Sequence, residues 1–341
     1  MSNKNINQIF EALTPRTEQK EKTYHNILMQ SQVEHKRQRR PPRVKLVRYA
    51  VLAAMLMASL TTTAFAAVYM GLDEAFIKFL KPSNNDQATY LSNGAYVVDK
   101  TIKNEYGSLT LKQVIGDSNL TYILMDFTAP EGTVLNAARY RFHTMHTTNQ
   151  SHSTGFEVLD DGNPNDHKIS LVMNIVTDSS VAGQTVDFKL YDLQAADPLP
   201  GIFETVIPGS WETAIKLDFK EYSTLYQINQ SFKLYGYTAI LKTISVSPIS
   251  ITLKIDSESL KEINNAAGRL KGFGPNENSD NFPITINYKD GTSETTSNFT
   301  GLTASDLLTN QLLTIKTFEN VINDKEISSF VFFDKEIPMK N

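Results

Sequence analysis

Cysteine is absent from this chain of 341 residues. Its absence excludes disulfide bonds, thiolate nucleophiles and zinc sites built on cysteine. Each domain must therefore be held together by its hydrophobic core. With 40% hydrophobic and 21% charged residues, the composition is that of a globular protein rather than a disordered one. The length allows two domains.

Charged side chains are missing from residues 49–72, YAVLAAMLMASLTTTAFAAVYMGL. As a helix, this stretch would be roughly 36 Å long at about 1.5 Å per residue. That length is enough to cross a hydrocarbon core of about 30 Å with some tilt. The segment therefore predicts one transmembrane helix.

The charges on the two sides of this segment have opposite signs. Residues 1–48 hold 11 Lys or Arg and 4 Asp or Glu, a net charge of +7, whereas residues 49–341 hold 22 and 33, a net charge of −11. Basic residues gather at 36–48, directly before the apolar stretch, and Asp73 and Glu74 follow it. The positive-inside rule then predicts a single-pass protein of the cell membrane, with a cytoplasmic N-terminus and extracellular C-terminal domains.

A cleaved signal peptide is the alternative interpretation of the apolar stretch. Residues 64–66, Ala-Phe-Ala, resemble a signal-peptidase site. However, a charged segment of 48 residues with its own helical pattern is much longer than the usual N-terminal part of a signal peptide. A retained membrane anchor is therefore the preferred prediction.

Two short amphipathic helices are expected in the cytoplasmic segment, residues 1–48. The first carries apolar residues at i, i+3, i+4 and i+7, namely Ile6, Ile9, Phe10 and Leu13. The second, over residues 15–40, has a thinner apolar face made by Tyr24, Ile27 and Leu28. Helices this short do not bury such faces alone, which favours a protein partner. The alternative is a solvated tail whose basic run fixes topology and touches anionic membrane lipid.

Helical spacing at residues 72–80 predicts one or two further turns that end at Pro82, followed by a polar spacer at 83–93. From Ala95 onward the pattern changes to short alternating segments separated by turn residues. The strands expected in a first domain lie at 95–103, 108–116, 119–128, 138–146, 168–177 and 185–192. Strands at this spacing without intervening helices favour an antiparallel sandwich over an α/β enzyme fold.

A second strand-rich block is expected after the proline-containing stretch 195–209. Its signals are alternating apolar positions at 215–219, 249–255 and 284–288, a turn at Ser247-Pro248, a hairpin turn at Asp290-Gly291 and a helix near 257–267. The predicted domains are residues 1–48, 49–72, 73–200 and 201–341. The predicted fold class is mostly β, with short N-terminal helices, one transmembrane helix and two β-sandwich, immunoglobulin-like ectodomains.

Catalytic and metal-binding patterns are weak. Four histidines gather between residues 143 and 167, namely His143, His146, His152 and His167. His143 and His146 would leave a strand on opposite faces, and the other two are expected in loops, so a metal site is disfavoured. Asp161, Asn163 and Asn165 match the start of a calcium loop whose later positions are wrong, and Trp211 is expected to be a core anchor. We therefore expect no enzyme, no cofactor, no metal site and no direct nucleic-acid binding.

The order of these features resembles a known family: the anti-sigma factors of Gram-positive bacteria that pair with extracytoplasmic-function sigma factors and carry ectodomains of unknown function. The resemblance rests on IFEALTPRTEQKEKTYHNIL at 9–28, the basic run and span at 36–72, PGSWETAIKLDF at 208–219 and LKTISVSPISITLKI at 241–255. It covers both sides of the predicted membrane segment. No one motif in it is as specific as a set of metal ligands.

The resemblance implies that the cytoplasmic segment holds a sigma factor away from RNA polymerase while the ectodomain receives or transmits an extracellular cue. The side chains that match the motif and lie on the apolar faces are Phe10, Leu13, Tyr24, Ile27 and Leu28. The chain departs from the best-known pattern, because a His-x-x-x-Cys-x-x-Cys zinc site is impossible without cysteine. A regulatory protease is a further partner at family level. A membrane-tethered adhesion or ligand-binding protein is the alternative function.

Overall fold

The computed structural model describes ten stretches of the chain, which are residues 71–82, 84–146, 151–159, 166–196, 202–267, 283–297, 302–318, 321–322, 326–332 and 335–339. All of them belong to one compact unit, Thr63–Asn341. The predicted cytoplasmic helices and almost all of the predicted membrane segment lie outside these stretches. Among the described residues, no helix has the length and hydropathy needed to cross a membrane.

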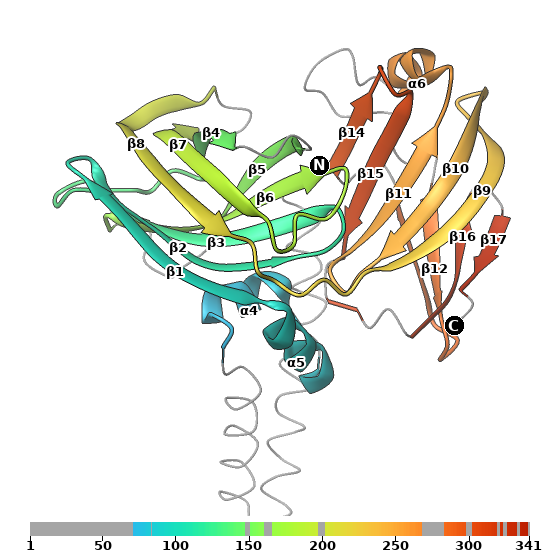
Figure 1. Cartoon of the computed structure of the whole chain (residues 1–341), viewed down its shortest axis with the longest axis horizontal. Helices are drawn as coiled ribbons and strands as arrows, with labels where there is room; N and C mark the ends of the chain where they lie inside the picture. Colours follow the sequence, from blue (N-terminus) through green and yellow to red (C-terminus); the bar gives the residue numbers. More distant parts are fainter. Residues whose placement is uncertain are drawn as a thin grey trace, which may run out of the picture. The chain divides into compact units, whose positions relative to one another are not determined.

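The described chain is mostly β and forms several antiparallel sheets (Figure 1). This confirms the β-rich fold class predicted from the alternating apolar positions. The first eight strands are β1 (Tyr96–Asn104), β2 (Gly107–Gly116), β3 (Leu120–Thr128), β4 (Arg139–His146), β5 (Ser151–Leu159), β6 (Lys168–Thr177), β7 (Thr185–Ala196) and β8 (Glu204–Lys216). They make a five-stranded sheet in the order β1-β2-β3-β6-β5 and a three-stranded sheet in the order β4-β7-β8. We call these two sheets the first sheet pair.

A hydrophobic core fills the space between the two sheets of the first pair. Phe127 on β3, Phe142 on β4 and Trp211 on β8 meet there, with ring centroids 5.2–5.7 Å apart in edge-to-face contacts. The indole Nε1 of Trp211 donates a 3.2 Å hydrogen bond to the carbonyl oxygen of Gly107. The prediction that Trp211 anchors a core is confirmed, although this core is that of the first sheet pair.

The remaining strands form a second sheet pair. They are β9 (Thr224–Leu234), β10 (Tyr237–Val246), β11 (Ser250–Asp256), β12 (Pro283–Tyr288), β13 (Ser293–Ser297), β14 (Leu302–Asp306), β15 (Gln311–Thr317), β16 (Ile327–Phe332) and β17 (Lys335–Pro338). Their sheets have the orders β14-β15-β11-β10-β9 and β13-β12-β16-β17. A separate core that includes Leu253, Ile286 and Phe330 lies between them. The predicted turns at Ser247-Pro248 and Asp290-Gly291 join β10 to β11 and β12 to β13, as expected.

Three helices accompany the described strands: α4 (Glu74–Leu80), α5 (Asn85–Gly94) and α6 (Leu260–Ala266). The helices predicted within 72–80 and 257–267 are confirmed as α4 and α6. The polar spacer predicted at 83–93 is wrong, because α5 occupies it. Asn84 caps α5 by accepting a 2.9 Å hydrogen bond from the backbone N–H of Gln87, and Leu91 is buried. Tertiary packing, rather than a strong apolar pattern, therefore holds this helix.

Helices α4 and α5 lie against the outer face of the five-stranded sheet in the first pair (Figure 1). Phe76 and Leu91 belong to a third hydrophobic cluster together with Tyr122 of β3. Ile249 and Ile315 of the second sheet pair belong to the same cluster. This cluster therefore joins the helices and both sheet pairs.

Two further predictions differ from the structure. Strand β5 was not expected, and it places His152 in a strand rather than a loop. Strand β8 pairs along its length with β7 and so belongs to the first sheet pair. The chain passes to the second sheet pair between Phe219 and β9, and not at residue 200. Pro208 does not interrupt β8, because β8 is the last strand of its sheet and the register shifts at that point.

Candidate functional site

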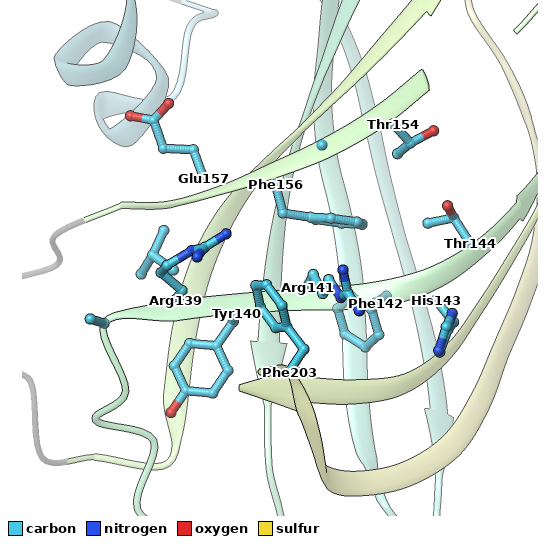
Figure 2. Close-up of a pocket in the computed structure, with 13 residues that line it drawn as sticks. Arg139, Tyr140, Arg141, Phe142, His143, Thr144, Thr154, Phe156, Glu157 and Phe203 are labelled. Carbon is cyan, nitrogen blue, oxygen red and sulfur yellow. The ribbon is translucent and has the colours of Figure 1, made fainter. Parts of the chain in front are cut away.

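An open groove lies between β4 and β5, the outer strands of the two sheets in the first pair (Figure 2). Its volume is about 610 Å³. Residues 138–144, residues 154–158 and Phe203 line it. Ligand sites commonly have volumes of about 300–1,000 Å³, so this groove is large enough for a small molecule or a short peptide.

The inner wall of the groove is aromatic. Successive side chains of a strand point to opposite faces, so Tyr140 and Phe142 of β4 turn toward the core and are buried. Phe156 of β5 packs against the same core, with its ring centroid 6.1 Å from that of Phe142. The wall is therefore largely apolar.

The alternate residues of β4 put positive charge on the other side of the strand. The guanidinium carbons of Arg139 and Arg141 lie 4.7 Å and 4.0 Å from the ring centroid of Phe203 (Figure 2). Arg141 also donates a 2.8 Å hydrogen bond through Nε to Oε1 of Gln194. Cation–π contacts and this hydrogen bond restrict the guanidinium groups, which leaves their remaining N–H groups for a ligand.

The electrostatics of the groove favour an anion. Among the described residues, no carboxylate lies within 4 Å of either arginine. Glu157 also lines the groove, but it leaves β5 on the face opposite to Phe156 and is exposed. The two arginines therefore form a local positive charge. The chain around them is acidic overall, because residues 49–341 have a net charge of −11. Guanidinium groups in this setting can bind carboxylate or phosphate oxygens through paired hydrogen bonds.

A second cluster fixes the first described residues, from Gly71 to Asp73, to strand β2. The side-chain amide of Gln113 on β2 donates to the carbonyl oxygen of Gly71, and its Oε1 accepts a 2.7 Å hydrogen bond from the backbone N–H of Asp73. Lys112 forms ion pairs with Asp73 and, at 3.5 Å, with Asp126. We call Gly71, Asp73, Lys112, Gln113 and Asp126 the anchor cluster.

Partial burial of Lys112 works to lower its pKa, but the hydrogen bond that its ammonium group donates to Asp73 and the negative charge of Asp126 outweigh burial, so the pKa of Lys112 is raised. Lys112 is therefore a charged side chain that joins α4 to β2 and β3. The Asp73 carboxylate also accepts a 2.9 Å hydrogen bond from the backbone N–H of Ala75, which caps α4.

A third polar cluster joins the two sheet pairs. Asp117, in the turn between β2 and β3, is fully buried and accepts hydrogen bonds of 2.6 Å and 2.5 Å from the hydroxyl groups of Ser247 and Ser250. The backbone N–H groups of Asn119 and Leu120 donate to its other oxygen at 2.9 Å and 2.8 Å. Burial raises the pKa of Asp117, although these four hydrogen bonds act in the opposite direction.

The residues predicted to bind a sigma factor, Phe10, Leu13, Tyr24, Ile27 and Leu28, lie outside the described residues. Of the four clustered histidines, His143 is exposed on β4 and His167 is exposed before β6. Asp161, Asn163 and Asn165 also fall outside the described ranges. Within those ranges, no three His, Cys, Asp or Glu residues gather closely enough to hold a metal ion.

Sequence reasoning did not identify the arginine groove. The alternation Arg139-Tyr140-Arg141-Phe142 predicts one charged and one apolar face of a strand. Phe203, however, is more than 60 positions away, within the proline-containing stretch 195–209 that separates the two predicted strand-rich blocks. Its contact with the arginines depends on the pairing of β7 with both β4 and β8, which local patterns do not specify.

Comparisons with known proteins identify no family. No protein-family model matches the chain, and no curated protein matches it. Among solved structures, the chain is similar to the crystal structure of a conserved domain protein from Bacillus anthracis. The TM-score is 0.46 and the identity 14%, over 69% of this chain and 75% of that chain. A similarity of this degree assigns no function.

Proposed function

We propose that this chain is a single-pass membrane anti-sigma factor. Residues 1–48 hold an extracytoplasmic-function sigma factor in the cytoplasm, residues 49–72 cross the membrane, and the β-rich region lies outside. Anionic membrane lipid contacts the basic run at 36–48, and a regulatory protease is a further partner. In this proposal the β-rich region controls the release of the sigma factor.

The observation that carries the proposal is the anchor cluster. Gly71 lies at the end of the predicted membrane segment and Asp73 follows it directly. Gln113 holds both residues on β2, and Lys112 pairs with Asp73. Strand β2 also ends at the turn that holds Asp117, which contacts the second sheet pair. A change in either sheet pair would therefore reach the start of α4 through one strand.

The proposal also includes the fold type of the two sheet pairs. Each sheet pair encloses its own hydrophobic core, which supports two immunoglobulin-like β-sandwiches in series. The polar turns that begin at Asp117 and Ser247 have the same backbone hydrogen bond. In each turn the N–H of the first residue donates to the carbonyl oxygen of the fourth, at 2.8 Å and 2.9 Å. The two sandwiches therefore meet through corresponding turns.

The proposal is tested by co-purification of the full-length chain with sigma factors expressed from the same genome. The double variant Leu13→Asp/Leu28→Asp places charge on both predicted contact faces and is expected to abolish capture and derepress the sigma regulon. Gln8→Asp/Gln32→Asp is the matched control, because it adds the same charge at polar positions. Capture of a sigma factor that the first variant leaves unchanged at equal abundance would contradict the predicted contact residues.

A membrane-tethered ligand-binding protein is the second candidate, and the groove between β4 and β5 favours it. In this case residues 1–48 have no protein partner. Failure of the abundant full-length chain to capture any sigma factor would support this alternative.

A further inference from the structure

We propose that the groove between β4 and β5 binds an extended acidic peptide segment, which adds as a strand to the free edge of β4 and places carboxylates on Arg139 and Arg141. This goes beyond the proposed function, since peptide binding does not depend on whether residues 1–48 hold a sigma factor. Three features of the groove carry the inference.

The first feature is the strand edge. Among the described strands, β4 pairs with β7 alone and β5 pairs with β6 alone, so each has one edge without a strand partner, and residues of both strands line the groove. The backbone N–H and C=O groups along such an edge can pair with an incoming extended segment. A peptide backbone supplies the matching donors and acceptors, whereas a polyphosphate or a sulfated glycan does not.

The second feature is the spacing of charge. Arg139 and Arg141 are two residues apart on β4, so they leave the strand on one face about 7 Å apart. Carboxylates at alternate positions of an added strand have the same spacing and would lie beside the guanidinium groups. Phe203 holds both guanidinium groups at 4.0–4.7 Å from its ring centroid, and they have no carboxylate partner among the described residues.

The third feature is the apolar wall on the opposite face. Residues of the added strand between the acidic ones would turn toward Phe142 and Phe156. The groove therefore fits a segment in which acidic residues alternate with apolar ones.

The test uses the full-length chain in mild detergent and a fluorescent hexapeptide of alternating Glu and Val, with binding followed by fluorescence anisotropy. Arg139→Gln/Arg141→Gln is expected to weaken binding about tenfold or more, because two charge-assisted contacts are lost. Lys103→Gln/Lys261→Gln removes the same charge from exposed positions outside the groove and is expected to leave binding within about twofold. Thermal unfolding of each variant checks that its fold is intact.

Two altered peptides separate the recognition modes. Replacing each Glu by Gln removes the carboxylates, and N-methylation at alternate residues blocks pairing with a strand edge; both changes are expected to abolish binding. Binding unaffected by N-methylation would overturn strand addition. Binding of a polyphosphate but not of the peptide, equal binding by the arginine variant, or no binding by the wild-type chain would each overturn the proposal. The sigma-factor experiment has a separate readout, so failure of one does not imply failure of the other.

Discussion

The Ser247 hydroxyl donates a 2.6 Å hydrogen bond to Oδ2 of Asp117, although the two residues lie 130 positions apart. Both are buried, and they belong to different sheet pairs. The same Ser247 oxygen accepts hydrogen bonds from the backbone N–H groups of Ile249 and Ser250 at 3.2 Å and 3.0 Å. Asp117 Oδ1 and the Ser247 hydroxyl oxygen each accept backbone hydrogen bonds within their own turns, so the join between the sheet pairs also sets the geometry of two hairpins.

Removal of the Asp117 carboxylate should destabilise the chain. Asp117→Ala leaves two backbone N–H groups and two hydroxyl groups without their acceptor, and we expect a loss of about 3 kcal/mol in the free energy of unfolding. Asp117→Asn keeps one oxygen for the backbone donors, so its loss should be smaller, about 1 kcal/mol. Urea unfolding followed by circular dichroism measures both.

The matched control for these variants is Asp99→Asn. Asp99 is exposed and has a positive φ of 44°, a conformation that Asn tolerates well. Its unfolding free energy should stay within about 0.5 kcal/mol of the wild-type value. Equal destabilisation by Asp117→Asn and Asp99→Asn would contradict the importance of the buried contact.

Stability should depend on pH through the same carboxyl group. Burial raises the pKa of Asp117 above its ordinary value of 3.8, so the folded chain binds this proton more tightly than the unfolded chain does. The stability linked to this proton is therefore fully present below about pH 3.8 and is lost as the pH rises through the folded-state pKa. The stability of the wild type relative to Asp117→Asn should fall as the pH increases from 4, measured by urea midpoints of both proteins. A difference that rises with pH would show that the hydrogen bonds outweigh burial.

Trp211 is the single tryptophan, so its fluorescence reports on the core of the first sheet pair alone. Trp211→Ala should cost about 3–5 kcal/mol, since it leaves a cavity beside Phe127 and Phe142. Tyr237→Ala is a suitable control because that ring is 38% exposed. Circular dichroism compares their melting temperatures with the wild type. Similar losses for the two variants would contradict the central position of Trp211.

Alternating apolar residues were enough to predict most strands and the hairpin turns. They failed where packing decides the structure. Helix α5 has a weak apolar pattern and is held by the buried side chain of Leu91 and the cap at Asn84. Strand β8 contains Pro208, which a local reading interprets as a break, but an edge strand accepts proline where no backbone hydrogen bond is needed.

The sites were harder to predict than the fold, because each joins distant segments. The anchor cluster brings Asp73 to Lys112, and the groove brings Phe203 to Arg139. Single-sequence patterns locate charged and apolar faces but do not specify which strand pairs with which. Asp117 had no sequence signal beyond a turn, since its burial arises from the approach of the second sheet pair.

The anchor cluster should control local opening of α4. Lys112→Gln removes the ion pairs with Asp73 and Asp126 while the cap from Asp73 to Ala75 remains. Partly exposed pairs of this kind contribute up to about 1 kcal/mol, which corresponds to about fivefold faster amide hydrogen exchange in α4. Hydrogen exchange followed by mass spectrometry measures this, with peptides from β3 as the reference for global unfolding.

Two variants on the same helix test whether the position of the charge matters. Lys78→Gln breaks the 3.1 Å pair with Glu74, but both side chains are highly exposed, at 68% and 82%, so exchange in α4 should change little. Asp73→Ala removes both the ion pair and the helix cap and should increase exchange more than Lys112→Gln does. If Lys78→Gln accelerated exchange as much as Lys112→Gln, the effect would come from helix charge in general, and β2 would not be the element that holds the start of α4.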